Sequence, residues 1–489
     1  MMRPIPRDAA RPIALAAVLF LSACASVPRL GPAPAVAPPG AYAAARTLAA
    51  TGDAAWPDAA WWRAYRDPQL DTLIGEALAG SPDLAAARAR IAQADGYAQQ
   101  AGATRLPSLD VAGNAGLTKQ SYNNGIPADF VPKGWNDTGR IEGQLGFDPD
   151  LWGRNRAGYA AARSDADAAR LDLAQARLTL STTVADAYAD LAALYAGRAV
   201  QASALGVRQQ TERLTTDRVT AGLDTRAELK QAQSAVPAAR ADLAATDEQI
   251  ALTRNRIAAL LGQGPDRGLA IAAPRATIGV RGLPADVTTD LIGRRPDVVA
   301  ARTRVEAEAS RIRIARADFY PSIRLSAVFG VVSLGLDNLL KGGSTAGTVG
   351  PAISLPIFRG GELAGRYRVA RGGYDGAVAD YDRTVAQAYR AVADAIVSQQ
   401  VLTTRLTESR RSLADSEAAY QVARLRYEGG LSRFLDVLTA QERVLQARSI
   451  VAGLEARAFT LDIALVRALG GGFTAPATAG PTDKDLPHG

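Results

Sequence analysis

The chain contains one unit twice, and this repetition constrains its fold more than any other feature. The segment SPDLAAARARIAQADGYAQQAGATRLPSL, which starts at Ser81, matches RPDVVAARTRVEAEASRIRIARADFYPSI, which starts at Arg295. Further along, AGLDTRAELKQAQ from Ala221 matches GGLSRFLDVLTAQ from Gly429. A solenoid needs at least about three stacked repeats, so two copies in one chain instead predict a pseudo-symmetric protomer.

Each copy changes from a helical pattern to a strand pattern directly after a proline. A charged, alanine-rich segment precedes Pro107 in the first copy and Pro321 in the second. The residues that alternate after the second proline are Ile323, Leu325, Ala327 and Phe329 on one side and Ser322, Arg324, Ser326 and Val328 on the other. A second alternating run ends near Phe147 in the first copy and near Pro356 in the second, so each copy supplies one β-hairpin. Strands of about ten residues suit a membrane β-barrel, but a soluble, half-buried sheet also fits the alternation.

Very long helices follow the hairpins. A helical pattern runs from about Ala157 to Thr220 and from about Ala364 to Glu428, which is roughly 96 Å each at 1.5 Å per residue. Shorter helices that return from these, or lead into the hairpins, are predicted at Leu223–Leu261, Leu431–Leu469, Asp83–Leu106 and Asp297–Tyr320. A returning helix and a leading helix placed end to end match one long helix, as a cylinder of uniform height requires. A plain antiparallel coiled coil would not explain hairpins at matched places in both copies.

These patterns predict an α-helical protein with transmembrane β-strands, built from two internal repeats with four strands per protomer. Four strands cannot close a barrel, and open strand edges are not tolerated in lipid. We therefore expect several protomers to pool their strands in one barrel.

Residues 1–23 have the features of a signal peptide, because a start with three arginines is followed by the short apolar run Ile13 to Leu21. The sequence LSAC, ending at Cys24, resembles the bacterial lipobox, in which the cysteine becomes the lipid-modified first residue of the mature protein. We expect covalent diacylglycerol and N-palmitoyl on Cys24, followed by an Ala/Pro-rich linker over 24–50. An ordinary signal peptide with a chance cysteine is the alternative.

The composition argues against an enzyme. Cys24 is the only cysteine and His488 the only histidine, so the base of a Cys–His or Ser–His–Asp system and the clustered ligands of a zinc site are missing. No glycine-rich phosphate loop of the G-x-x-x-x-G-K-[ST] or G-x-G-x-x-G type follows a strand. The formal net charge is +7, but the arginines are spread among Asp and Glu along helical segments. We expect no catalysis, no cofactor other than the lipid, no metal site and no nucleic-acid partner.

The order of several short motifs resembles that of the outer membrane factor family, the TolC-like channel-tunnels, and especially its NodT-type lipoproteins of RND efflux systems. The motifs are LSAC, WWRAYRDPQLDTLIGEAL from Trp61, DLWGRNRA from Asp150, IGRRPDVVAAR from Ile292, FYPSI, LPIFRGG from Leu355 and YEGGLSRFLDVLTAQERVLQAR from Tyr427. They cover nearly the whole mature chain. The resemblance implies a homotrimer with a twelve-stranded β-barrel in the outer membrane, continued by a long α-helical barrel through the periplasm that is closed at its lower end.

On this resemblance the chain divides into two structural repeats joined by a collar. The expected parts are a first repeat over 51–262 with its hairpin at 107–150, an equatorial connection over 263–295, a second repeat over 296–470 with its hairpin at 321–357, and a flexible tail over 471–489.

The resemblance places contacts with a periplasmic adaptor at the turns between the long and the returning helices. The expected contact residues are Arg218, Gly222, Arg426 and Gly430. Glycine suits these turns because it ends helices in the left-handed conformation. The alternative for the two arginines is that they complement the helix dipole.

Acids just beyond these turns are the candidates for a periplasmic gate. The implied gate residues are Glu228, Asp436, Arg433, Thr439 and Glu442. Asp436 matches an aspartate that rings the closed pore in the family. Thr439 stands where many relatives carry a second aspartate, and Glu442 stands where some carry arginine, so both depart from the family pattern. First-turn acids favoured by the helix dipole are the alternative.

The implied function is a passive exit duct for drugs or other toxic small molecules, lipid-anchored and barrel-inserted in the outer membrane and reaching into the periplasm. Its partners would be a periplasmic adaptor (membrane fusion) protein, an inner-membrane RND or other pump, and outer membrane lipid. Two alternatives remain open: a duct for type I protein secretion, and a structural coiled-coil protein of the cell envelope.

Overall fold

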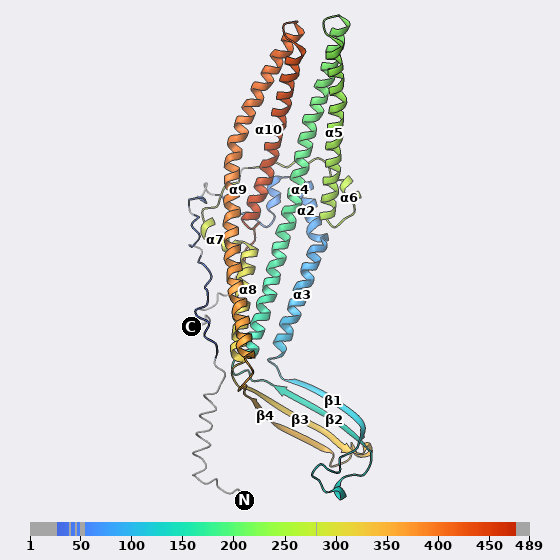
Figure 1. The fold of residues 1–489 in the computed structure, drawn as a ribbon, viewed down its shortest axis with the longest axis vertical. Helices are drawn as coiled ribbons and strands as arrows, with labels where there is room; N and C mark the ends of the chain where they lie inside the picture. Colours follow the sequence, from blue (N-terminus) through green and yellow to red (C-terminus); the bar gives the residue numbers. More distant parts are fainter. Residues whose placement is uncertain (1–26, 39–40, 45, 49–53, 280, 476–489) are drawn as a thin grey trace.

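Long helices lie side by side through most of the molecule, and a four-stranded sheet extends from one end of them (Figure 1). The computed structural model of the chain describes residues 27–38, 41–44, 46–48, 54–279 and 281–475. The helices are α2 (Pro68–Gly80), α3 (Pro82–Ala103), α4 (Arg154–Thr220), α5 (Arg226–Leu260), α6 (Asp266–Leu269), α7 (Val287–Arg294), α8 (Pro296–Ala317), α9 (Glu362–Glu428) and α10 (Phe434–Ala468). The strands are β1 (Ser108–Thr118), β2 (Asn136–Phe147), β3 (Ser322–Leu334) and β4 (Thr345–Ser354), with 3-10 turns η2 (Trp61–Tyr65), η3 (Ala128–Phe130) and η4 (Leu336–Asn338).

The helices of the two repeats have equal lengths. Both α4 and α9 have 67 residues, both α5 and α10 have 35, and both α3 and α8 have 22. At 1.5 Å per residue, α5 and α3 placed end to end come within about 15 Å of the length of α4. The pattern that predicted a cylinder of uniform height is therefore present in the fold.

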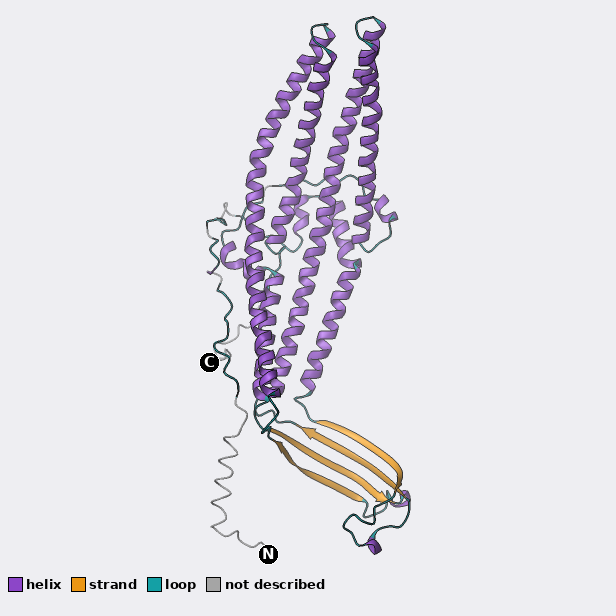
Figure 2. Ribbon diagram, in the orientation of Figure 1, coloured by secondary structure: helices purple, strands orange, loops and turns teal. Residues whose placement is uncertain are grey.

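The two long helices carry different neighbours along their length. Near the sheet the order is α3, α4, α8, α9, and towards the opposite end it is α5, α4, α10, α9. The strands occupy only the end where α3 and α8 stop, as Figure 2 shows. Each half of the helical layer is thus four helices wide.

Apolar stripes at helical spacing form the two main cores, at mid-height. Val184 and Tyr188 of α4 are fully buried beneath Trp61 and Leu70. In α9, Val385 belongs to the second core, together with buried leucines of the segment around α7. Burying such side chains stabilises the fold by about 1.5–3 kcal/mol each, so η2, α2 and the segment around α7 hold the long helices together.

Buried hydrogen bonds also connect the helices at this mid-height level. The Tyr65 hydroxyl donates to Asp462 Oδ2 at 2.6 Å, and Arg281 Nε donates to Asp462 Oδ1 at 3.1 Å. The Tyr188 hydroxyl donates to Asp67 Oδ2 at 2.7 Å. Burial raises the pKa of the Tyr65 hydroxyl, and the neighbouring Asp462 carboxylate raises it further. These hydroxyls therefore remain proton donors to their carboxylates.

Two glycines in matched positions let the returning helices end against the chain. A Cβ on Gly262 would lie 2.6 Å from the carbonyl oxygen of Gly80, and a Cβ on Gly470 would lie 2.0 Å from that of Arg294. Both glycines also have positive φ, 74° and 87°. Only glycine meets both requirements at once, which explains why both repeats place one there.

The sheet is antiparallel with the order β1-β2-β3-β4, and its register sorts the side chains onto two faces. Across the strands, Leu145 pairs with Leu109 and with Ala327, and Ala327 pairs with Val349. The residues of the opposite face include Asp110, Arg140, Glu142, Gln144 and Arg324. One face is thus apolar and the other polar, as a barrel wall between lipid and water requires.

The Ala/Pro-rich segment after the expected lipid site packs along α9 over its described residues. Arg371 donates to the backbone oxygens of Gly31 and Pro32 at 3.1 and 2.5 Å, and Asp382 accepts from the Ala37 amide at 3.1 Å. Val27 packs against an apolar cluster at the junction of the helices with the sheet. This stretch follows α9 towards the sheet, whereas the expected lipid site Cys24 lies outside the described residues.

Candidate functional site: the helix tips and the gate

The two tip turns, at the end of the helical layer farthest from the sheet, have the same glycine-based geometry (Figure 1). At the first, Gly222 has φ 72° and the Leu223 amide donates to the Arg218 oxygen at 2.8 Å. At the second, Gly430 has φ 74° and the Leu431 amide donates to the Arg426 oxygen at 2.7 Å. No atom lies within 4 Å of a Cβ built on either glycine. The positive φ alone therefore selects glycine here.

The two repeat-equivalent arginines have different surroundings. Arg218 Nε donates to Asp224 Oδ2 at 3.1 Å, and its guanidinium carbon lies 4.4 Å from the centre of the Tyr427 ring. Its side chain is only 14% exposed. Arg426 is exposed and makes no side-chain hydrogen bond or ion pair with the described residues. Arg218 is therefore held inside the protomer, and Arg426 is the one available to a partner.

Asp224 joins the two helical hairpins. Besides the bond from Arg218, its carboxylate accepts a hydrogen bond from the Tyr427 hydroxyl, which comes from α9. Its side chain is 6% exposed, and Tyr427 is buried with Phe434 and Ala232 in a small apolar cluster. Burial raises the pKa of Tyr427 to about 12, and the bond to Asp224 adds to the shift. We call Arg218, Asp224 and Tyr427 the tip clasp.

Asp224 and Tyr427 do not recur in the other repeat, so the repeat pattern did not indicate them. Asp224 is aligned with Ser432, and Tyr427 with Val219. The Ser432 hydroxyl is buried and has no hydrogen-bond partner among the described residues. The sequence feature that could have indicated the two residues is therefore that each has a different side chain at the matching position of the other repeat.

Two of the candidate gate acids, Glu228 and Asp436, lie at the start of a helix. Glu228 Oε2 accepts from the Thr225 amide at 2.6 Å, and the Glu228 amide donates to Thr225 Oγ1 at 3.4 Å, which is a capping box. Asp436 Oδ2 accepts from the Arg433 amide at 3.0 Å. The Arg433 guanidinium makes no ion pair with Asp436 in the described structure. Both acids thus have a helix-start role, whatever else they do.

The other two gate candidates differ in what they contact. The Thr439 hydroxyl donates to the Leu435 oxygen of its own helix at 2.8 Å. Glu442 instead accepts from Arg208 of α4 at 3.2 Å. This contact and the tip clasp both connect one hairpin to the other, but the Glu442 side chain is 67% exposed, so its ion pair is screened and weak.

A groove of about 660 Å³ between α9 and α10 gathers part of the predicted gate. Its lining includes Asp436 and Thr439 together with Arg443, Glu408 and Arg411. Glu228 does not line it, and neither does the Arg433 side chain. The structure of one protomer therefore brings Asp436 and Thr439 together and leaves Glu228 at the other tip.

The described part of the chain has neither a metal-binding cluster nor a membrane-spanning helix. It holds no group of three or more His, Cys, Asp or Glu side chains arranged to bind a metal ion. None of its helices is both long and apolar enough to cross a membrane.

A family model described as outer membrane efflux protein matches residues 73–263 and 287–471, which are the two repeats. The chain belongs to this family. Its members are channel and transport proteins rather than enzymes.

Individual relatives agree with this assignment. The chain is 38% identical to the fusaric acid resistance protein FusA of Burkholderia cepacia over 76% of this chain and 71% of that protein. It is 29% identical to the multidrug resistance outer membrane protein MdtP of Escherichia coli K12 over 88% of both chains. Its structure is similar to that of the outer membrane protein VceC of Vibrio cholerae, with a TM-score of 0.82 and 43% identity, over 86% of this chain and all of that one.

Family membership gives the protomer its context. This efflux protein is an outer membrane channel whose trimer combines a β-barrel with a helical barrel in the periplasm. The predicted fold class is thereby confirmed. The outer edges of β1 and β4 are unpaired within the protomer, and the tip clasp lies at the end of the helices farthest from the sheet.

Proposed function

We propose that this protein is the passive exit duct of a tripartite efflux system and that it exports drugs or other toxic small molecules. The observation that carries the proposal is the protomer itself, which supplies a four-stranded sheet, one third of a twelve-stranded barrel, with two unpaired edges, and a helical layer of uniform height. Three such protomers enclose a continuous passage, and nothing in the described residues suggests chemistry along it. The names of FusA and MdtP refer to fusaric acid and multidrug resistance, which favours efflux over type I protein secretion.

The test is complementation in a bacterial host that lacks its own outer membrane efflux channels, with the native adaptor and pump supplied together. We expect tolerance to at least one toxic compound to rise, with no change when the adaptor is left out. A channel that conducts in planar bilayers but never restores tolerance would contradict the efflux assignment.

The adaptor is proposed to dock on the exposed residues of the tips. Leu223 and Leu431 occupy equivalent places in the two turns and are 65% and 73% exposed, so both tips offer an apolar side chain to a partner. Arg426 lies beside the second turn and makes no side-chain hydrogen bond or ion pair with the described residues, whereas Arg218 is held by the clasp. A cysteine placed at Leu223 should crosslink to the adaptor. If it instead reacts only with extracellular reagents, the tips do not face the periplasm and the proposed orientation is wrong.

The closed state is proposed to depend on the tip clasp and on the gate acids. The clasp holds the hairpins of one protomer together, and Glu228 and Asp436 bring carboxylates towards the mouth when three protomers meet. Asp436 faces a groove that also holds Thr439, so the ring carries fewer acids than in relatives with a second aspartate there.

Lipidation of Cys24 is also proposed. It is supported by the LSAC sequence and by Val27, which packs against the cluster of Phe319 and Tyr367 at the junction with the sheet. Three residues span at most about 10 Å, so a lipid on Cys24 would lie close to this junction. Cys24→Ser with a conventional cleavage site should abolish palmitate labelling while trimers still form, and persistent labelling would disprove the lipid assignment.

A further inference from the structure

The helical layer has one inner seam, where the two repeats meet, and two outer edges. Towards the sheet the order is α3, α4, α8, α9, so the inner seam lies between α4 and α8, and the outer edges are α3 and α9. Because the matched helices have equal lengths, α8 repeats α3 from Pro82 and Pro296 onwards, and α9 repeats α4 from Arg154 and Glu362 onwards. Each contact across the inner seam therefore has an equivalent pair of positions, one on each outer edge.

Contacts inside each repeat show that equivalent positions have equivalent neighbours. Tyr159 of α4 lies against Arg105, whose guanidinium carbon is 4.0 Å from the ring centre. The equivalent Tyr367 of α9 lies against Phe319, with ring centres 6.4 Å apart, and Phe319 is the equivalent of Arg105. The same two positions thus touch in both repeats although the residue types differ.

One face of α4 is covered by α8. Its residues are spaced by four, four, three and four positions and therefore lie on one side of the helix; they are Ala157, Ala161, Asp165, Ala168 and Asp172. The three alanines are 6%, 4% and 2% exposed. Asp165 and Asp172 accept hydrogen bonds from Arg311 and Arg304 of α8, each at 2.5 Å.

The equivalent face of α9 is uncovered in the protomer. Its residues are Gly365, Val369, Gly373, Gly376 and Asp380. Val369 is 76% exposed, whereas its equivalent Ala161 is 4% exposed. A Cβ built on Gly376 meets no atom within 4 Å, although the equivalent Ala168 is buried. Glycine inside a helix costs about 1 kcal/mol relative to alanine, and it lets another helix approach closely.

The other outer edge, α3, has an uncovered face that matches the covered face of α8. Ala300 and Ala307 of α8 are fully buried. Their equivalents in α3, Ala86 and Gln93, are exposed. The reason is that α8 has a helix on each side, α4 and α9, whereas α3 has only α4 beside it in one protomer.

We propose that the outer seam between neighbouring copies in the trimer repeats the inner seam, with α3 of one copy packed on the uncovered face of α9 of the next. The inner Arg304–Asp172 pair has Arg90 and Asp380 as its equivalents. Arg90 is exposed and forms no ion pair with the described residues, and the Asp380 side chain is 69% exposed. Both charges are conserved between the repeats, so Arg90 of one copy pairs with Asp380 of the next.

A second contact is conserved in position but not in chemistry. The equivalents of Arg311 and Asp165 are Tyr97 and Gly373. Tyr97 is 56% exposed in the protomer, and Gly373 presents no side chain. In the outer seam the Tyr97 ring therefore packs on the backbone of α9, where the inner seam has an ion pair.

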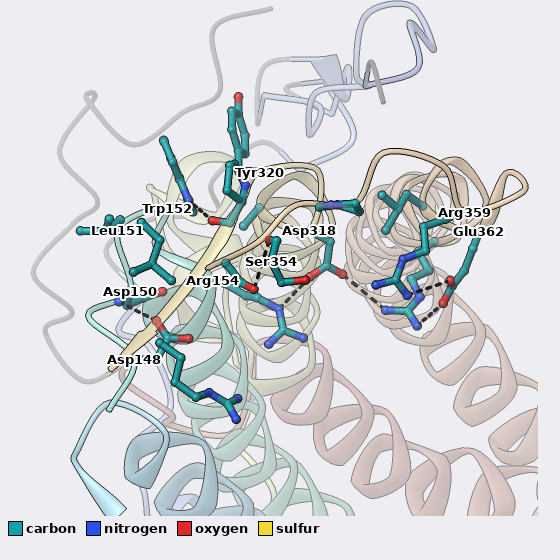
Figure 3. A pocket seen from close by; sticks show the side chains of 18 residues that line it. Asp148, Asp150, Leu151, Trp152, Arg154, Asp318, Tyr320, Ser354, Arg359 and Glu362 are labelled. Atoms are coloured by element: carbon teal, nitrogen blue, oxygen red, sulfur yellow. Dashed lines mark hydrogen bonds and ion pairs between the residues drawn. The ribbon is translucent and has the colours of Figure 1, made fainter. Parts of the chain in front are cut away.

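At the sheet the inner seam has contacts that the outer edges cannot copy (Figure 3). Arg154 Nε donates to Asp318 Oδ1 at 2.7 Å, and Trp152 Nε1 donates to the Pro321 oxygen at 2.6 Å. The equivalents of Arg154 and Trp152 are Glu362 and Gly360, whose side chains have no such donor. The repeated part of the seam therefore ends at the junction with the sheet.

Towards the tips the seams also differ. The inner Arg208–Glu442 pair has Ser416 and Ser234 as its equivalents, so no ion pair is repeated there. The outer seam is thus held by charge in the half nearer the sheet and not at this level. Neighbouring copies can separate at the tips while they remain joined near the membrane.

Crosslinking tests the seam. Cys24 is the only cysteine of the chain, so Cys24→Ser gives a background without thiols. In this background, Arg90→Cys combined with Asp380→Cys should give covalent trimers with a short thiol-reactive crosslinker, because α4 and α8 separate the two sites within a protomer. Each single cysteine should give no crosslink, since a ring contact joins two different surfaces. The control combines Arg90→Cys with Asp382→Cys, which lies on the side of α9 that holds the Ala/Pro-rich segment.

Charge exchange tests the ion pair itself. Arg90→Asp or Asp380→Arg alone places like charges across the seam and should lower the temperature at which SDS-resistant trimers dissociate by a few degrees. The double exchange should restore most of the loss. An exposed ion pair is weak, so the restoration, and not the size of the loss, identifies the pair.

A substitution on the covered face tests the packing. Gly376→Trp should prevent trimers from forming, whereas Gly376→Ala should retain them, because the equivalent position of α4 is Ala168. Far-UV circular dichroism of the Gly376→Trp protein should show intact helices, since the protomer has room at this position.

Four outcomes would overturn the proposal. They are equal crosslinking of the test pair and the control pair, no crosslinking of the test pair, dimers from a single-cysteine variant, and a charge exchange that restores nothing. These readouts require only an assembled trimer. A trimer that crosslinks as expected but never exports would contradict the proposed function and leave this seam intact.

Discussion

At the scale of single residues, the carboxylate of Asp224 is the point where the two hairpins of a protomer meet. It accepts from Arg218 of its own hairpin and from Tyr427 of the other. Removing a hydrogen-bond donor from a buried carboxylate is strongly destabilising, since hydrogen bonds to charged groups contribute about 1.5–3 kcal/mol. By comparison, the exposed Arg208–Glu442 pair contributes at most about 1 kcal/mol. We therefore expect the clasp, and not that ion pair, to dominate the closed state within a protomer.

Replacing Tyr427 by Phe tests the clasp. The change removes the hydroxyl that donates to Asp224 and keeps the ring beside Arg218, so the closed population should fall about tenfold. Single-channel recording in planar bilayers should show larger or longer openings. Tyr420→Phe is the control, because Tyr420 packs in the same cluster and its hydroxyl bonds to none of the described residues. If Tyr427→Phe channels open as wild-type channels do, the tip clasp does not stabilise the closed state.

The same hydroxyl predicts a dependence on alkaline pH. Burial and the bond to Asp224 raise the pKa of Tyr427 to about 12, above its usual value of about 10. A group with a raised pKa contributes its stability fully below the usual pKa and loses it as the pH rises through the raised one. Conductance of wild type should therefore increase between about pH 10 and pH 12. Tyr427→Phe should show no such increase, and a parallel rise in both proteins would assign it to another group.

The gate acids give a separate prediction. In the proposed gate, Glu228 and Asp436 from three protomers converge on the mouth, where two like charges 4 Å apart would cost about 4 kcal/mol at an effective dielectric of 20 unless a cation neutralises them. The double replacement by Ala should weaken cation selectivity, measured as the reversal potential under a KCl gradient. Because each acid also caps a helix, Thr225→Ala is the control that weakens a cap and keeps the charge. An unchanged reversal potential would leave only the helix-start role.

At the scale of elements, the long helices and the position of the hairpins were predictable from the sequence. Helical periodicity over unusually long stretches and a proline at each helix end contain that information locally. The packing of the Ala/Pro-rich segment against α9 was not predictable from the sequence. Its composition indicates that the segment forms no core of its own, but not which distant residues it contacts. Arg371 and Asp382 hold that segment from positions far along the chain, and such contacts leave no periodic signal.

Glycines at the helix ends give the prediction at this scale. Gly470→Ala places a Cβ 2.0 Å from the Arg294 oxygen and keeps a φ of 87°, so the collar must shift. Gly222→Ala meets no atom within 4 Å and should cost only about 1 kcal/mol for its positive φ. Thermal unfolding of the trimers should show a much larger loss for Gly470→Ala. Equal losses would mean that the collar adapts without cost.

At the scale of the whole molecule, one protomer is an incomplete wall. Its sheet has a lipid-facing side and a polar side, but β1 and β4 expose unpaired backbone groups along their outer edges. Such groups are costly in a membrane, so closure through neighbouring copies is required. The sequence predicted this need from the count of strands. It did not show which side chains face each other across the seam, because that register depends on residues of different chains.

Disulfide trapping between edge strands tests the closure directly. The polar face of β1 carries Asp110, Ala112 and Asn114, and that of β4 carries Ala346, Thr348 and Gly350. Within one protomer β1 and β4 are three strand spacings apart, about 14 Å, which is too far for a disulfide. Cysteine pairs taken one from each set should therefore yield covalent trimers that reducing agent dissolves, with the best pair reporting the register. A pair on opposite faces, Val111 with Thr348, is the control and should remain uncrosslinked. If no same-face pair gives trimers, or if the control gives as many, the barrel is not closed by β1 of one copy against β4 of the next.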